Sequence, residues 1–493
     1  MEVTAAALGL LLTPSVLGVM AAAALLGLLV GALPGLTATL GVALLVPFAV
    51  MLEPLPALAG VVTLAAMAIT AGDLPGALLK VPGTPASAAY AEAAHRLAQR
   101  GRAGLALGTG LVCAAAGGGT GALVLLFGAP ALAWVALHMS TVERFWLACL
   151  GLGAAALVAG PSVPRGALAL LIGLALALVG LDPVSGQPRL TFGLTDLSGG
   201  LGLIPVMIGL FAVSRVLSHA LDGAAGAGRP PRVGSVLGGV GRVLGRRRRA
   251  MALGGAIGTL VGAVPGAGAD IAAYVAQAVT KRLAPGCAED ADARDLDAIV
   301  PAATANNAAV GGALVPATVL GIPGDSLTAV VIGVLMLKGV TPGPSAFLLQ
   351  PELMTAVLLA FLLANLLLVP AGLLAIAVVR PVLRVPPSVL MPCVLALGLV
   401  GTYAVERTPT ALVVTLGAGV LGLLMERARV PVAPAVLGFV LGPTIEEMAL
   451  TSLMKSGGDP AVFLSRPAAL GLAGLTLLVW LGPALRALVR RLR

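Results

Sequence analysis

Three acidic residues lie within or beside long apolar runs of this sequence. They are Asp73 in ITAGDLPG, Asp270 in PGAGAD and Asp325 in GIPGDS. A charge at the centre of a bilayer costs about 2.5–3.5 kcal/mol on insertion scales, so such acids usually face a cavity and bind an ion or carry a proton. We therefore expect all three to act in ion coupling, with either Na⁺ or H⁺ as the ion.

Pro-Gly pairs interrupt the apolar runs at 34–35, 82–83, 265–266 and 323–324. Proline removes a backbone donor and glycine permits unusual φ, so a helix stops there and restarts. A restarted helix presents free N–H groups and the positive end of its dipole, which favours an anion. Nearby hydroxyl and amide groups can orient a carboxylate. The candidate substrate-binding residues are Gly35, Thr37, Thr39, Gly83, Thr84, Ser87, Gly266, Asn306, Asn307, Gly324 and Ser326.

Lys80 comes just before the second Pro-Gly pair and is the candidate charge of the site. It can pair with Asp73, two helical turns earlier, or meet a substrate anion. The 4 cysteines and 3 histidines are scattered without metal-ligand spacing. We expect no metal site and no cofactor, apart from Na⁺ if that is the coupling ion.

The amino-acid composition indicates which kind of secondary structure contains these residues. The chain has 493 residues, 59% of them hydrophobic and 10% charged, with a mean hydropathy of +1.05. Soluble domains carry about 25% charged residues. Continuous apolar runs of about 20 residues recur along the chain, which favours spanning helices over a β-barrel. We expect an all-α polytopic membrane protein of about 10–13 membrane helices, including broken or re-entrant hairpins.

The order of the Pro-Gly pairs indicates an internal duplication. GALPGLTATL and KVPGTPASAA in the first half match GAVPGAGADI and GIPGDSLTAV in the second. The units start 231 residues apart, and the acidic insert EDADARDLD accounts for the longer spacing in the second. Discontinuous helices at corresponding places of two repeats are the best sequence pointer to a transporter's binding site.

Arginine clusters predict how the two units are oriented. The first unit is followed by cations at 96–102 and the second is preceded by cations at 242–249, with a third cluster at 486–493. Cationic loops mark the cytoplasm, so the net charge of +9 is not a signal for nucleic acid. If both inner clusters are cytoplasmic, the repeats are inverted. We expect a first half at 1–225, a basic cytoplasmic linker at 226–250 and a second half at 251–493.

Five motifs together resemble the large membrane subunit of the tripartite tricarboxylate transporters. They are GALPGLTATLGVALLVPFAV, VPGTPASAA, GAVPGAGADIAAYVA, NNAAVGGALVPATVLGIPGDS and KGVTPGPSAF, and the likeness runs from about residue 15 to residue 455. The resemblance implies a multi-pass protein of the bacterial inner membrane that imports carboxylates on an ion gradient. It also implies a small membrane subunit and a periplasmic solute-binding protein as partners. At ITAGDLPGALLK the chain departs from the tyrosine- and glycine-rich stretch usual in the family.

Two other classes remain open from the residues. One is a stand-alone secondary transporter or channel of another family. The other is an intramembrane aspartyl protease that uses Asp73 and Asp270 as its dyad. Such proteases resemble one another in a G-x-G-D motif, whereas GAGAD here puts the acid one residue later. We therefore expect a transporter rather than an enzyme.

Overall fold

The computed structural model describes residues 2–33, 36–158, 162–182, 185–222, 233–264, 268–283, 290–382 and 387–492. Within them the chain is almost entirely helical. The exception is a small antiparallel ribbon, in which Gly180 of β1 (Gly180–Leu181) lies opposite Arg189 of β2 (Pro188–Arg189). The predicted all-α fold class is confirmed.

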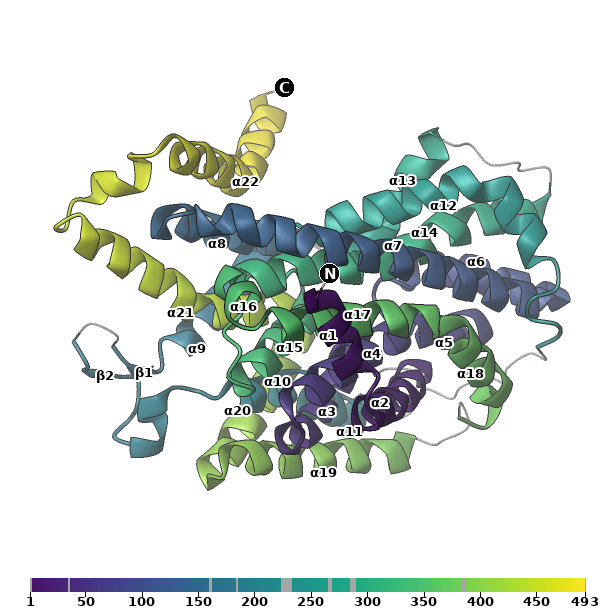
Figure 1. Ribbon diagram of the computed structural model, residues 1–493, viewed down its shortest axis with the longest axis horizontal. Coiled ribbons are helices and arrows are strands. Elements are labelled where there is room, and N and C mark those ends of the chain that lie inside the picture. The colour runs from purple at the N-terminus through teal and green to yellow at the C-terminus, as the bar shows by residue number, and fades with distance from the viewer. Residues whose placement is uncertain are drawn as a thin grey trace.

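The segments that carry the repeated motifs form two sets of helices (Figure 1). The first set is α2 (Pro14–Ala32), α3 (Ala38–Met51), α4 (Pro54–Ala71), α5 (Asp73–Leu79) and α6 (Ala88–Leu97). The second set is α12 (Val240–Gly262), α13 (Gly268–Leu283), α14 (Ala291–Leu320) and α15 (Ser326–Leu337). Residues 240–250 of the expected linker therefore belong to α12.

The remaining helices surround or connect these sets. In chain order they are α1 (Glu2–Leu11), η1 (Ala98–Arg102), α7 (Ala103–Leu137), α8 (Thr141–Val158), α9 (Val163–Ala177), η2 (Thr195–Gly199), α10 (Leu203–Ile208), η3 (Gly209–Val213), α11 (Ser214–Asp222), α16 (Pro344–Leu349), α17 (Pro351–Leu366), α18 (Leu368–Val382), α19 (Pro387–Glu406), α20 (Pro409–Arg427), α21 (Val432–Lys455), η4 (Pro460–Leu464) and α22 (Pro467–Leu492).

The length and composition of the helices fit a multi-pass membrane protein. Among the described residues, eight helices are long and apolar enough to span a bilayer, and the pair α17 and α18, bent by 49°, adds a ninth. Five shorter apolar helices accompany them, including α3 and α15. Short helices at the expected breaks account for much of the difference from about 10–13 spans estimated by length alone.

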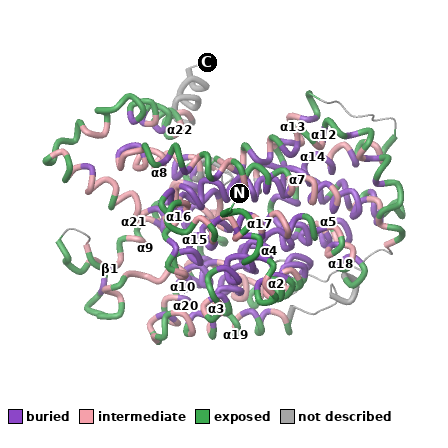
Figure 2. Tube along the Cα trace, in the orientation of Figure 1, coloured by how far each residue is buried: buried purple, intermediate pink, exposed green. Residues whose placement is uncertain are grey.

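Helices α4, α5 and α14 of the two sets supply the centre of the molecule. The most apolar stretch of α4 and α5 is 100% buried inside the protein, and that of α14 is 94% buried. The corresponding stretch of α19 is only 28% buried, and α19 and α22 lie at the edges (Figure 2). A helix whose apolar surface faces protein all round is a core element, whereas an exposed apolar helix is suited to lipid contact.

Glycines let the first helix of each set approach the third closely. A Cβ at Gly31 of α2 would lie 2.2 Å from the Ala68 carbonyl oxygen of α4. A Cβ at Gly262 of α12 would lie 2.2 Å from the Ala309 carbonyl oxygen of α14. Gly262 lies 231 residues after Gly31, which is the offset between the first Pro-Gly pairs of the two sets. The two sets therefore share a packing contact as well as a motif, since small residues allow close approach of membrane helices.

Helices α4 and α14 run antiparallel to each other. Thr70, near the end of α4, bonds to Asn307 in the middle of α14. Leu58, near the start of α4, lines the same small cavity as Thr318, near the end of α14. The third helices of the two sets thus point in opposite directions.

Charged side chains gather at the end of the molecule where α14 begins. Asp295 accepts from Arg96 at 2.6 Å and from Arg100 at 2.5 Å. Arg247, which is 8% exposed, donates from Nε to Asp297 at 2.6 Å. The clusters at 96–102 and 242–249 therefore meet the acidic insert on one face, while the side chains of the cluster at 486–493 lie outside the described part.

A half-buried lysine links the two sets at the other end. Lys338 follows α15, and its Nζ donates to the carbonyl oxygens of Val50 at 2.9 Å and Leu52 at 2.6 Å, where α3 ends. Burial lowers the pKa of Lys338. The cation thereby satisfies carbonyl groups that a helix end leaves without partners.

Candidate substrate and ion site

The second Pro-Gly pair of each set packs against the end of that set's first helix. The Gly83 N–H donates to the Gly72 carbonyl oxygen at 3.1 Å, and a Cβ at Gly83 would lie 3.0 Å from the Gly31 carbonyl oxygen. In the second set, a Cβ at Gly324 would also lie 3.0 Å from the carbonyl oxygen of Gly262. Backbone approaches this close require glycine. The two breaks therefore occupy matching positions.

Matching pairs of reciprocal hydrogen bonds follow these breaks, and the pair in the second set is the capping box of α15. The Ser87 N–H donates to Thr84 Oγ1 at 3.1 Å, and the Thr84 N–H donates to Ser87 Oγ at 3.2 Å. The Thr328 N–H donates to Asp325 Oδ1 at 2.8 Å, and the Asp325 N–H donates to Thr328 Oγ1 at 2.9 Å. Reciprocal bonds of this kind satisfy two first-turn donors. Thr84, Ser87 and Asp325 therefore stabilise helix starts, and any contact with substrate or ion stays a prediction.

The first turns of α3 and α15 meet across the two sets. Thr39 Oγ1 of α3 lies 3.2 Å from Ser326 Oγ of α15. Thr37 caps α3 by accepting from the Leu40 N–H at 3.2 Å. The first turn of a helix leaves backbone donors without an intrahelical acceptor, so two positive helix ends face one region beside two hydroxyl groups.

Part of the predicted site lies outside the described residues. This holds for both first breaks, which contain Gly35 and Gly266, and for the side chain of Asp270 in α13. Gly268, which follows the third break, packs against Asp325, since a Cβ there would lie 2.7 Å from the Asp325 Cβ. With the Thr39–Ser326 contact, the described flanks of the breaks form one connected group.

Asp73 follows Gly72, whose carbonyl oxygen accepts from Gly83 of the second Pro-Gly pair. Tyr90 Oη of α6 donates to Asp73 Oδ1 at 2.5 Å and accepts from Asn306 Nδ2 of α14 at 3.2 Å. The neighbouring Asn307 Nδ2 donates to Thr70 Oγ1 at 2.7 Å. Both asparagines are buried, and their Oδ1 atoms have no hydrogen-bond partner. The adjacent amides thus connect the second set to α4 and α6 of the first.

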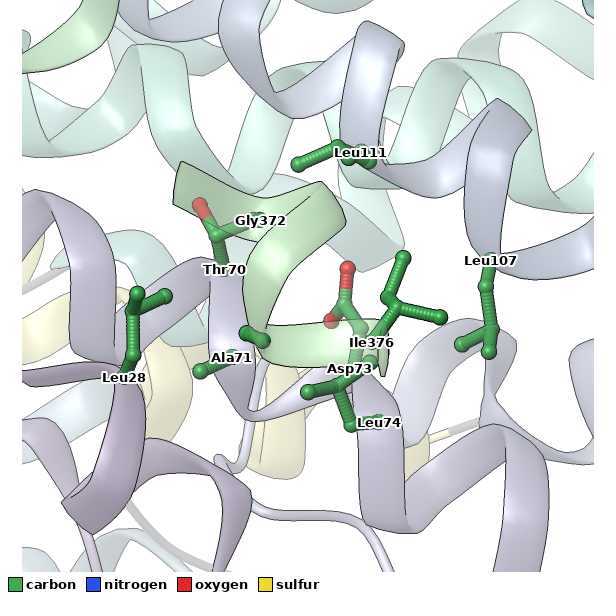
Figure 3. Close-up of a pocket in the computed structure, with 10 residues that line it drawn as sticks. Leu28, Thr70, Ala71, Asp73, Leu74, Leu107, Leu111, Gly372 and Ile376 are labelled. Carbon is green, nitrogen blue, oxygen red and sulfur yellow. The ribbon is translucent and has the colours of Figure 1, made fainter. Parts of the chain in front are cut away.

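The Asp73 carboxylate points into a small pocket (Figure 3). The cavity volume is about 20 Å³, which is enough for about one water molecule. Thr70 and Asp73 are the polar residues of its lining, and the rest is apolar or glycine. The rest comprises Leu28, Ala71, Leu74, Leu107, Leu111, Gly372, Ala375 and Ile376.

Lys80 does not pair with Asp73. It ends α5 in the left-handed conformation with φ of 60°, and its Nζ lies 3.7 Å from Glu92 Oε1. The Lys80 side chain is 60% exposed, so the pair with Glu92 contributes little to stability. The turn directs the Lys80 side chain away from Asp73 and toward Glu92.

Sequence analysis missed Tyr90 and Thr70. Tyr90 is one of only three tyrosines in the chain, and it follows the second Pro-Gly pair by seven residues. A lone tyrosine in an alanine-rich stretch indicates a buried polar contact, because a buried hydroxyl needs a hydrogen-bond partner.

The fold and this site define a multi-pass helical membrane protein whose buried polar groups gather where helices break. The chain belongs to the tripartite tricarboxylate transporter TctA family, which it matches over residues 17–437. It is therefore a large membrane subunit of that transporter class.

Two relatives from Agrobacterium vitis are similar to the chain. One, named an uncharacterized 52.8 kDa protein in the TAR-I ttuC′ 3′ region, is 31% identical over 92% of this chain and 90% of its own length. The other, an uncharacterized protein in the TAR-II ttuC′ 3′ region, is 33% identical over 45% of this chain and 90% of its own length. No solved structure matches the chain.

Proposed function

We propose that this chain is the permease subunit of a binding-protein-dependent secondary transporter that imports di- or tricarboxylates across the bacterial inner membrane. A gradient of Na⁺ or H⁺ drives the import in this proposal. A small membrane subunit and a periplasmic solute-binding protein are the partners, and membership of the TctA family supports such a three-part assembly.

The observation that carries the proposal is the meeting of α3 and α15 at Thr39 and Ser326. Each helix N-terminus favours an anion by roughly 0.3–1 kcal/mol when exposed and up to about 2 kcal/mol when partly buried. Hydroxyl donors add orientation without the cost of burying a cation. A site of neutral donors binds weakly and releases readily, which suits a permease that receives its substrate from a binding protein.

We further propose that the two sets are inverted repeats. The opposite directions of α4 and α14, together with the shared offset of Gly31 and Gly262, support this architecture. The site then lies between the repeats, where many secondary transporters bind their substrates.

For ion coupling we assign first place to Asp73 and keep Asp270 as a second candidate. Asp325 caps α15, so its carboxylate already has a structural role. Asp73 is half-buried and accepts from a neutral donor, Tyr90. An intramembrane acid without a cationic partner is a functional-site hypothesis by default.

Uptake by the complete three-component complex in proteoliposomes tests the proposal. Calorimetry of the solute-binding protein against citrate, succinate and malate first selects the carboxylate. Thr39→Ala and Ser326→Ala should raise the substrate concentration for half-maximal uptake, whereas Ser465→Ala, an exposed serine bonded within its own turn, should not. Absence of uptake of any bound carboxylate under either ion gradient would overturn the proposal.

A further inference from the structure

Asp73 and Tyr90 of the first set form a polar chain with Asn306 of α14, and the second set has apolar residues where the first has Asp73 and Tyr90. The positions of the second set that correspond to Asp73 and Tyr90 are Leu314 and Val331, 241 residues later. Leu314 and Val331 line one small cavity, as two residues at positions matching the bonded Asp73 and Tyr90 would. The second set therefore packs with apolar side chains at the positions that correspond to Asp73 and Tyr90. Packing of this fold does not require an acid at residue 73.

The surroundings of Asp73 leave its charge without a counter-charge. Among the described side chains, no Lys, Arg or His pairs with Asp73. The titratable groups that face it are Tyr90 of α6 and the buried Cys113 thiol of α7. The remaining neighbours in its pocket are apolar apart from Thr70. Burying an unpaired charge is costly unless the group is neutralised, so this carboxyl needs either a proton or a cation.

The pocket favours a proton over a metal cation. Hard cations are held by several oxygen ligands, and the pocket lining offers oxygen side chains from Thr70 and Asp73 only. Thr70 Oγ1 is already engaged, because it donates to the Ala66 carbonyl oxygen at 3.1 Å and accepts from Asn307 at 2.7 Å. One Asp73 oxygen accepts from Tyr90. Too few free oxygens remain for a Na⁺ site, whereas a proton needs one.

We propose that Asp73 is the proton-carrying residue of this transporter, and that Tyr90 and Asn306 relay its protonation state to α14. This inference rests on the proposed carboxylate import and names its coupling ion. With Asp73 ionised, Asn306 donates to Tyr90 and Tyr90 donates to Asp73, as the structure has it.

Protonation reverses the direction of the chain. The acid O–H then donates to Tyr90 Oη, and the Tyr90 O–H donates to the Asn306 amide oxygen, which has no partner in the ionised arrangement. The Asn306 amide turns over to present that oxygen, which changes hydrogen bonds but hardly changes shape. Since Asn306 belongs to α14, a proton bound in the first repeat changes a contact of the second. The proton enters and leaves at one carboxyl oxygen, and no other covalent bond is made or broken.

Proteoliposomes containing the whole complex test this inference under two imposed gradients, acid outside or Na⁺ outside. The variants are Asp73→Asn, Tyr90→Phe and, as a matched control, Glu92→Gln, an exposed acid of α6. We expect the wild type and Glu92→Gln to accumulate carboxylate on the acid gradient. Asp73→Asn should lose this accumulation by about tenfold or more while it still exchanges internal for external carboxylate, because exchange moves no net proton. Tyr90→Phe should retain accumulation at reduced efficiency.

Infrared difference spectroscopy of the purified complex provides a readout that needs no transport. A carboxylic-acid C=O band that appears on acidification in the wild type and is missing in Asp73→Asn supports the inference. Accumulation on Na⁺ alone that Asp73→Asn leaves unchanged would overturn the inference and leave the proposed function standing. Absence of any uptake would overturn the proposed function, and absence of the infrared band would still decide against proton binding at Asp73.

Discussion

The hydroxyl groups of Thr39 and Ser326 lie 3.2 Å apart, although 287 residues separate them in the chain. Each belongs to the first turn of a helix that restarts after a Pro-Gly pair. The contact brings one restarted helix of each repeat to the same place. It is the geometric basis for the carboxylate site that we propose between the two sets.

The close glycine contacts predict that a Gly→Ala substitution lowers stability by a similar amount in each of the two sets. Gly31→Ala and Gly262→Ala should each lower stability by about 1–3 kcal/mol, because both place a Cβ 2.2 Å from a carbonyl oxygen. Gly18→Ala is the control, since nothing lies within 4 Å of a Cβ there. Thermal unfolding in detergent measures the effect. An unchanged melting temperature in either of the first two variants would contradict the shared packing.

In the arginine cluster at 242–249, we expect Arg247 to stabilise the fold and the exposed Arg248 to contribute almost nothing to stability. Arg247→Ala should destabilise the protein by about 1–3 kcal/mol, because it leaves Asp297 and the Ala293 carbonyl oxygen without their donor. Arg248→Ala should have almost no effect, since Arg248 is exposed. The same melting assay compares them, and equal effects of the two substitutions would refute the assignment.

The cap at Asp325 predicts a difference between two substitutions. Asparagine is as good an N-cap as aspartate, whereas loss of a cap costs about 0.5–2 kcal/mol. Asp325→Asn should therefore keep stability, uptake and ion dependence, and Asp325→Ala should lose stability. If Asp325→Asn instead changed the ion dependence of uptake at normal protein levels, the carboxylate would be a coupling group after all.

The charged end of the molecule should face the cytoplasm. A cysteine introduced by Gly245→Cys, at an exposed position in the arginine cluster, should resist an impermeant thiol reagent applied to intact cells. Met51→Cys is the matched site at the opposite end, where the residue is 83% exposed, and it should react. The reverse pattern of labelling would invert the proposed topology.

Sequence patterns predicted the helical membrane fold and the places where helices break, because hydropathy and Pro-Gly pairs act locally. They also singled out Thr39, Ser326 and the asparagine pair. They did not predict that Thr84 and Ser87 bond to each other or that Asp325 caps α15, because a hydroxyl or carboxylate beside a helix start can bond to the backbone or to a ligand equally well. The partners of Asp73 and Lys80 depend on the path of the chain between α5 and α6. Tertiary packing sets that path, and the local sequence does not reveal it.

Disulfide cross-linking between α3 and α15 tests the central claim most directly, that substrate passes between the restarted helices of the two repeats. Thr39→Cys and Ser326→Cys are combined in a variant that lacks the native cysteines, since the contact of the two hydroxyls puts the side chains near disulfide reach. We predict that oxidation abolishes carboxylate uptake by the reconstituted complex, that a reductant restores it, and that bound citrate slows the cross-link. Undiminished uptake by fully cross-linked protein would contradict the account.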